Sequence, residues 1–309
     1  MTRAFRIPMR VPFRGLTERA GLLLQGPFGW AEFSPFPDHP PRLAAQWLAA
    51  AREAATIAWP LPVRASIPVN VTVPAVSPEE AHAIVVASGC TTAKVKVGID
   101  DDYGRVEAAR AALGPRGLIR IDVNGWWDVE TAVASIRRLS RFDLEYVEQP
   151  VATLEDMKRL RARVDVPLAA DESVRTADDP RHLDLKEAAD VVVLKVHPLG
   201  GVWAALEIAD ALGLPAVVSS ALETSIGLAA GVALAAALPE LKHACGLGTA
   251  RMLKTDVVAD PLVPIAGEIE VRRPSIDEEA LGACEIGEAE AAELIRRMRD
   301  AEQLLQATR

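Results

Sequence analysis

From about residue 66 onward, apolar and polar positions follow a repeating pattern. Short apolar runs recur, and each is followed by a longer Ala-rich stretch with helical spacing of its apolar residues. This order predicts buried parallel strands with helices outside them. Eight such runs predict a closed (β/α)₈-type barrel in preference to an open sheet. The runs are IPVNVTV, TAKVKVG, LIRIDVN, LEYVEQP, PLAADES, VVVLKVH, PAVVSSALE and KHACGLG.

The two ends of the chain have a different pattern. Residues 1–65 begin with three strand-like segments and pass through a Pro-rich turn into the amphipathic stretch RLAAQWLAAAREAAT. Residues 257–309 are strand-like and turn-rich before the charged helical stretch EAEAAELIRRMRDAEQLLQ. We therefore expect an α/β protein with two domains. Residues 66–256 form the barrel, and residues 1–65 with 257–309 form an α+β capping domain beside it.

Composition and charge narrow the classes of partner. Half of the 309 residues are hydrophobic, which is ample for a large core. A net charge of −9 disfavours binding to nucleic acid or to an anionic membrane surface. There is no apolar run of the roughly 18 residues that a spanning helix requires. Three widely spaced cysteines without metal-ligand spacing predict a reduced, cytoplasmic protein. The sequence does not predict the oligomeric state.

Charged residues interrupt the predicted strands at one recurring position. Successive members are 23 to 26 residues apart, which is one strand–helix unit, and the next step leads to Ser219. The position falls near the carboxyl end of each strand, where barrel enzymes place their chemistry. Because side chains alternate along a strand, Lys94 and Asn124 are expected to share the inward face. The recurring residues are Lys96, Asp122, Glu148, Asp171 and Lys195.

Three carboxylates on adjacent strands predict a metal site. Unpaired, they would repel one another, and burial would add a desolvation cost that a divalent cation removes. Oxygen ligands favour a hard ion, Mg²⁺ first and Mn²⁺ second. Lys96 and Lys195 come from strands two and six, which lie opposite each other in a ring of eight. Either lysine could act as a base, since a nearby ammonium and a metal ion disfavour its charged form.

Each feature also has an ordinary structural explanation when it is taken alone. The segment KVK is usually a solvated strand edge, and an Asp at a strand end is as often a helix cap. Protein stability does not require three acids and two lysines at one level of a barrel. Their common register therefore favours a functional site.

The motifs AKVKVG, IDVNGWW, EYVEQP, AADES and VVVLKVHPLGG resemble the motif series of the enolase superfamily, in its muconate-lactonizing subgroup. The resemblance covers nearly the whole chain. It implies a modified (β/α)₇β barrel with an α+β cap. It also implies Mg²⁺ held by Asp122, Glu148 and Asp171, with Lys96 and Lys195 as the acid–base pair.

Within the subgroup, the chain is most similar to the family of o-succinylbenzoate synthases. The similarity lies in RIPMRVPFRGLTERAGLLLQ, in LPAVVSSALETSIGLAAGVALAAAL and in the compact cap. It implies a Mg²⁺-dependent dehydration of a small cyclic dicarboxylate through a metal-stabilised enediolate. Gly248 is a departure, since many such synthases have an acid there. Expected substrate-binding residues are Lys94, Asn124, Ser219 and Ser220, although the two serines could instead cap the turn after strand seven.

Other functions remain open at this point. An N-succinylamino acid racemase, or a related isomerase of the subgroup, needs the same two lysines, one on each side of the substrate. A catalytically silent barrel that serves as a binding protein is a second possibility, which the intact five-residue set disfavours. A Schiff-base aldolase is a third, but it would leave the three carboxylates without a role.

Overall fold

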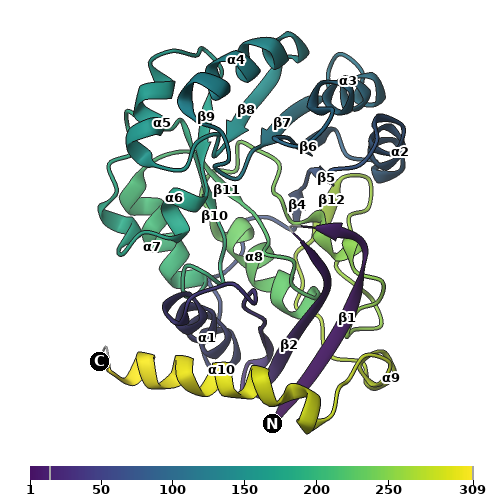
Figure 1. Cartoon of the computed structure of the whole chain (residues 1–309). Helices are drawn as coiled ribbons and strands as arrows, with labels where there is room; N and C mark the ends of the chain where they lie inside the picture. The colour runs from purple at the N-terminus through teal and green to yellow at the C-terminus, as the bar shows by residue number, and fades with distance from the viewer. Residues whose placement is uncertain (14, 308–309) are drawn as a thin grey trace.

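The computed structural model describes residues 1–13 and 15–307 and shows two lobes (Figure 1). The larger lobe is built on seven parallel strands that neighbour one another in sequence order. This order is the one that strand–helix repeats generate. The strands are β5 (Val71–Val73), β6 (Thr92–Lys96), β7 (Leu118–Asp122), β8 (Leu144–Glu148), β9 (Leu168–Ala170), β10 (Val191–Leu194) and β11 (Ala216–Val218).

Residues 245 and 246 close the sheet into a barrel. Gly246 forms a parallel bridge with Ser219 after β11, and Cys245 forms one with Val69. Val69 lies between β4 (Ser66–Pro68) and β5, which are two parts of the first strand. The two-residue segment therefore occupies the eighth strand position. The predicted closed barrel is confirmed.

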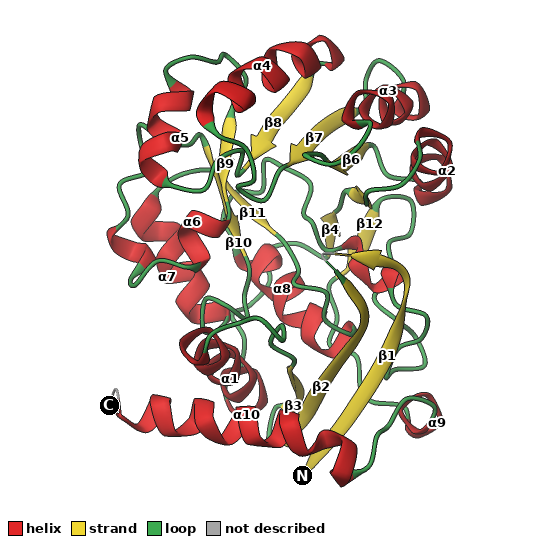
Figure 2. Cartoon of the chain, viewed as in Figure 1, coloured by secondary structure: helices red, strands yellow, loops and turns green. Residues whose placement is uncertain are grey.

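Seven α-helices follow the seven strands on the outside of the barrel (Figure 2). Several begin at a polar cap; Ser77 and Glu80, for example, form a capping box at α2. After the eighth strand position comes only the 3₁₀ turn η3 (Gly248–Met252), so the barrel is of the (β/α)₇β type. No helix in the described part of the chain combines the length and apolar character needed to cross a membrane. The seven are α2 (Pro78–Ser88), α3 (Asp102–Leu113), α4 (Val129–Leu139), α5 (Leu154–Arg161), α6 (Glu172–Arg175), α7 (Val202–Leu212) and α8 (Ser225–Ala237).

The smaller lobe joins the two ends of the chain. Its strands form one antiparallel sheet, and α1 packs against α10, which crosses the lower edge of the molecule in Figure 1. The three strands and two helices that the sequence predicted are present. Its elements are β1 (Thr2–Phe13), β2 (Leu16–Gly26), β3 (Gly29–Phe33), α1 (Pro41–Thr56), α9 (Glu278–Gly282) and α10 (Glu288–Ala307).

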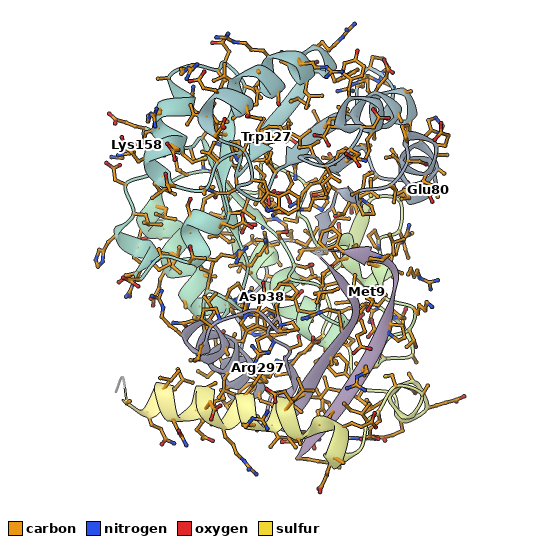
Figure 3. All side chains as sticks on the ribbon, viewed as in Figure 1. Met9, Asp38, Glu80, Trp127, Lys158 and Arg297 are labelled. Carbon is orange, nitrogen blue, oxygen red and sulfur yellow. The ribbon has the colours of Figure 1, made fainter. Side chains whose placement is uncertain are left out.

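The hydrophobic core has two main parts that correspond to the lobes. Figure 3 shows the side chains filling the space between the ribbons, with Lys158 directed outward from α5. Ala221 and Leu222, in the loop after β11, pack in the core of the smaller lobe. Conversely, β12 (Glu268–Glu270) pairs with β4 in the barrel. The chain therefore crosses between the lobes more than once, and the domain boundaries given above stay a prediction.

Candidate active site

The strand register brings the predicted residues to one end of the barrel. Lys96 is paired with Asp122, and Asp122 with Glu148, across three adjacent strands. Asp171 directly follows β9, and Lys195 directly follows β10. All five side chains are buried, as is Lys94. The lysines of β6 therefore point into the barrel, as the alternation of side chains predicts.

Two lysines of β6 bind the carboxylates of the next two strands. Lys94 Nζ lies 2.9 Å from Asp122 Oδ2 and 2.7 Å from Glu148 Oε1. Lys96 Nζ lies 2.9 Å from the same Asp122 oxygen and also donates to Asn124 Oδ1. Asn124 has a left-handed backbone conformation (φ 53°), which turns the chain immediately after β7. Lysine and carboxylate groups thus alternate from β6 to β8.

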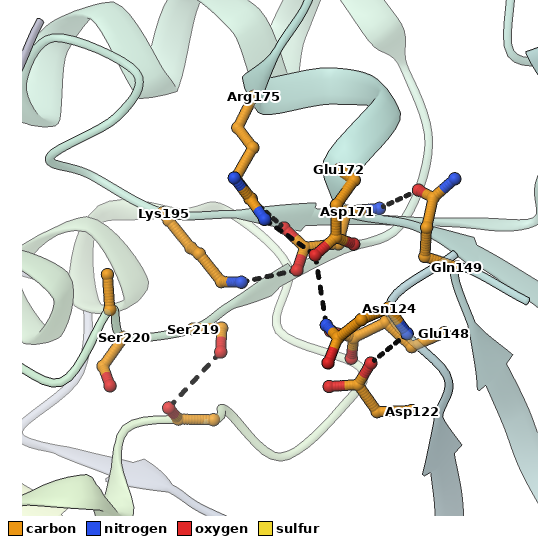
Figure 4. Close-up of polar contacts among 12 residues, drawn as sticks. Asp122, Asn124, Glu148, Gln149, Asp171, Glu172, Arg175, Lys195, Ser219 and Ser220 are labelled. Atoms are coloured by element: carbon orange, nitrogen blue, oxygen red, sulfur yellow. Dashed lines mark hydrogen bonds and ion pairs between the residues drawn. The ribbon is translucent and has the colours of Figure 1, made fainter. Parts of the chain in front are cut away.

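Asp171 has cations on two sides (Figure 4). Lys195 Nζ donates to its Oδ2, and Arg175 Nε lies 3.3 Å from its Oδ1. Arg175 also donates to Glu172 Oε1 at 2.7 Å, and that oxygen accepts from Asn124 Nδ2 at 3.1 Å. Lys195 and Lys96 thus bind different carboxylates, on different sides of the cluster.

The three carboxylates suit a hard divalent cation, and one of their oxygens has no hydrogen-bond donor within the described residues. Asp171 Oδ1 is buried and accepts no hydrogen bond within the described residues, although Arg175 lies nearby. Three buried carboxylates without sulfur ligands match the preference of Mg²⁺. As their side chains stand, the acids are turned toward the lysines. No three acids in the described part of the chain are gathered closely enough to share an ion. The three-carboxylate ligand set therefore stays a prediction.

Burial and mutual repulsion shift the protonation equilibria of the cluster. Burial, together with the Asp122 charge, raises the pKa of Glu148 to about 7. Burial and the neighbouring Lys94 ammonium lower the pKa of Lys96. Burial opposes charge on Lys94 as well, but Asp122 and Glu148 outweigh it and hold the Lys94 pKa well above its usual range. The two β6 lysines therefore differ, and Lys96 is the one that loses its proton more easily.

The smaller lobe closes the pocket above these residues. Phe13, at the end of β1, places its ring centroid 5.5 Å from Lys96 Nζ, and Phe36 and His39 also line the pocket. The cavity that remains is about 40 Å³, which holds about one water molecule. A substrate of ring size therefore requires some of the lining side chains to change position.

Ser219 and Ser220 line the same pocket. Ser219 Oγ lies 3.5 Å from the carbonyl oxygen of Gly246, and Ser220 Oγ lies 2.5 Å from Thr249 Oγ1. Ser220 Oγ also accepts from the Leu222 amide at 3.3 Å. The serines thus have local contacts and access to the pocket, and both interpretations of their role stay open.

Sequence reasoning missed the residues that support the acids. Gln149 Oε1 accepts from the Asp171 amide at 3.0 Å. Arg175 contacts the Asp171 carboxylate and is itself bound by Glu172. Gln149 belongs to the motif EQP. Its backbone has φ 37°, which is typical of a constrained turn. His197, two residues after Lys195, lies 2.9 Å from Glu223 and stacks on Trp47. This places His197 in a buried contact with the smaller lobe.

The barrel, the capping lobe and the buried cluster of acids and lysines are together typical of acid–base enzymes of the enolase type. The families described as "Enolase N-terminal domain-like" and "Enolase C-terminal domain-like" match residues 4–55 and 77–275. An o-succinylbenzoate synthase from Thermobifida fusca is 61% identical over 93% of this chain and 92% of its own length. The chain therefore belongs to the enolase superfamily and, within it, to the family of the o-succinylbenzoate synthases.

Solved structures share the fold at lower identity. Muconate lactonizing enzyme from Pseudomonas fluorescens superposes with a TM-score of 0.80 at 22% identity, over 92% of this chain and 98% of that one. N-succinyl Arg/Lys racemase from Bacillus cereus gives 0.77 at 21% identity, over 93% and 97%. Members of the superfamily use a divalent metal ion. The same fold thus carries several activities, so the substrate has to be argued from the site and from the family.

Proposed function

We propose that this chain is a Mg²⁺-dependent o-succinylbenzoate synthase of menaquinone biosynthesis. It would convert 2-succinyl-6-hydroxy-2,4-cyclohexadiene-1-carboxylate into 2-succinylbenzoate and water. Membership of the synthase family at 61% identity carries this proposal. The buried set of three acids and two separated lysines supports it, because proton removal next to a carboxylate requires both charge stabilisation and a base.

Asp122, Glu148 and Asp171 would hold the metal ion, with Mg²⁺ preferred and Mn²⁺ as a substitute. When bound, the ion would polarise the substrate's ring carboxylate and make its α-proton more acidic. The three carboxylates must then turn from Lys94, Lys96 and Lys195 toward a common centre. Gln149 accepts a hydrogen bond from the Asp171 backbone amide, and Arg175 contacts the Asp171 carboxylate. These two contacts limit how far Asp171 moves.

Lys96 would act first as base and then as acid. Asp122 and Asn124 orient its ammonium group, and the lowered pKa makes the neutral amine accessible. Lys96 takes the proton α to the ring carboxylate, and the electrons move into an enediolate. Lys96 then returns that proton to the departing hydroxyl group on the same face. Water leaves and the ring becomes aromatic, so atoms and charge balance.

Lys195 would stabilise the developing negative charge from the other side. Its ammonium group is buried and, in this structure, donates a hydrogen bond to Asp171. A fixed cation in a site that excludes water stabilises an oxyanion more than a solvated one does. Lys94, Asn124, Ser219 and Ser220 complete the proposed substrate contacts, with the serines near the succinyl carboxylate. A small-molecule partner and a cytoplasmic location belong to the same proposal.

An assay with the cyclohexadiene substrate tests the proposal. We expect rapid loss of the diene absorbance with Mg²⁺, no turnover with excess EDTA, and recovery when Mg²⁺ is restored. Lys158→Ala, on the outer side of α5, is the matched control for a lysine substitution and should retain full turnover. Turnover that persists in EDTA after extensive dialysis would refute the metal part of the proposal. The absence of turnover with every divalent ion tested would refute the assignment of this substrate.

A racemase of N-succinylamino acids is the second candidate, because a lysine stands on each side of the cluster. Such an enzyme exchanges the α-proton of both enantiomers with solvent. We expect slow or no deuterium incorporation into N-succinylamino acids, measured by proton NMR in D₂O. Exchange at a rate comparable to dehydration would add racemisation to the function.

A further inference from the structure

The ring of helices around the barrel has a gap. Seven helices follow seven strands, whereas the eighth strand position is followed by the short turn η3. On β5, Thr72 faces inward in register with Lys94, so Val71 faces outward. Val71 is only partly buried, whereas Ala93, its partner on β6, is fully buried. The missing helix therefore leaves apolar barrel surface partly uncovered.

A cavity of about 260 Å³ lies in this gap, between β5, α2, η3 and the end of β1. This volume is near the lower end of the range for small-molecule sites, about 300–1,000 Å³. Its wall is mainly apolar. The apolar part consists of Val11, Val71, Pro74, Ile84, Ala87 and Met252.

Two guanidinium groups stand at this cavity, and backbone oxygens hold them. Arg10 donates to the carbonyls of Leu253 and Lys254 at 3.0 and 3.3 Å, and Arg251 donates to the carbonyl of Pro264. These hydrogen bonds hold the two guanidinium groups in place, but the neutral carbonyl oxygens do not compensate their positive charge. Within residues 1–13 and 15–307, neither arginine forms an ion pair with a carboxylate.

This arrangement contrasts with the rest of β1. Arg3 binds Glu278 and Glu285, and Arg6 binds Glu18 and Glu290. Arg10 is therefore the one arginine of β1 within the described residues that has no carboxylate partner, and it lies with Arg251 beside an apolar wall. Planar guanidinium groups match carboxylates, and their remaining N–H donors are available for a ligand.

We propose that this cavity binds a small carboxylate with an apolar body, such as an arylalkanoate. The carboxylate would pair with Arg10 and Arg251, and the body would cover Val71 and Ile84. The site is separate from the proposed reaction site and goes beyond the proposed function. Thr72 lines both cavities, so a ligand here would lie directly behind the wall of the reaction pocket.

Titration calorimetry of the full chain with 4-phenylbutanoate tests this site. The matched probe 4-phenylbutanamide has the same body without the charge, and we expect it to bind at least tenfold more weakly. Arg10→Gln/Arg251→Gln should weaken 4-phenylbutanoate binding at least tenfold. Ala87→Trp fills the cavity from α2 without changing charge, and should abolish binding. The control Arg116→Gln/Arg137→Gln removes two arginines elsewhere on the surface and should bind as the wild type does.

Three results would overturn the proposal. One is no measurable binding of 4-phenylbutanoate to the wild type. Another is undiminished binding in Ala87→Trp, which would place the ligand elsewhere, for example in the reaction pocket. The third is equal binding of the acid and the amide, which would remove the role of the arginines. If the double arginine variant fails to fold, Ala87→Trp and the amide still decide the question.

Discussion

The barrel holds two charged clusters that are built differently, one fully buried and one that is partly exposed at Glu145 and His243. The reaction cluster consists of Lys94, Lys96, Asp122, Glu148, Asp171 and Lys195. The Arg120 cluster consists of Arg120, Glu145, His243 and Asn70. Arg120 lies two residues before Asp122 on β7 and is paired with Lys94 on β6, so the two clusters lie next to each other.

In the Arg120 cluster, the charge is held by short hydrogen bonds and by packing, although Arg120 Nη2 has no hydrogen-bond partner within the described residues. Arg120 donates to Glu145 at 2.6 Å and to the carbonyl oxygen of Ala244 at 2.6 Å, and it packs on the Tyr146 ring. In the reaction cluster, three lysines on long flexible side chains contact acids on neighbouring strands. Buried charge alone therefore does not mark a reactive site. Replaceable partners do, because they can give way to an ion and a substrate.

The largest expected effect is on turnover. Lys96→Ala removes the proposed base, and we expect kcat to fall by about 10²–10⁴-fold, the usual contribution of general acid–base catalysis. Mg²⁺ binding, measured by calorimetry, should persist because the carboxylates remain. Turnover within a few fold of wild type would remove Lys96 from the mechanism.

Lys94→Met should destabilise the metal-free protein by about 3 kcal/mol, because Glu148 and Asp122 are left buried with less compensation. Saturating Mg²⁺ should recover at least half of that loss, since the bound ion compensates the negative charges of Asp122 and Glu148 in place of the lysine. Urea unfolding with Mg²⁺ and with EDTA measures both values. An identical loss in the two conditions would contradict a metal at this place.

Arg120→Met provides the opposite case. Glu145 loses a buried partner, so we expect a loss of about 3 kcal/mol that Mg²⁺ does not recover. Turnover of the folded variant should stay close to wild type. If Mg²⁺ rescues this variant as it rescues Lys94→Met, the distinction between the clusters fails.

The smallest effect concerns pH. Burial opposes charge on Glu145, but hydrogen bonds from His243 and Arg120 outweigh it and lower the pKa of Glu145. A lowered folded-state pKa stabilises the fold above the unfolded value, about 4.3, and this stabilisation is lost as pH falls through the folded value. The difference in unfolding free energy between wild type and Glu145→Gln, measured without metal, should therefore shrink from pH 7 to pH 3.5. A difference that is independent of pH would show that the charge of Glu145 contributes little.

Sequence periodicity predicts the barrel and the inward direction of Lys94 and Lys96, because alternation along a strand leaves only two choices and the neighbouring strands are apolar. It does not predict Arg175. That residue belongs to a four-residue helix, too short for a periodic pattern, and reaches Asp171 because positions four apart share one helix face. Phe13 and Phe36 could not be predicted either, since their place over the pocket depends on how the two lobes pack.

A crystal structure with Mg²⁺ would test whether the three acids share a metal ion. We expect one ion with an oxygen from each of Asp122, Glu148 and Asp171 at about 2.0–2.1 Å. The ammonium groups of Lys96 and Lys195 should stand on opposite sides of the ion, and Lys94 should be displaced from Glu148. An ion bound elsewhere, or one that contacts only a single member of the three acids, would contradict the account.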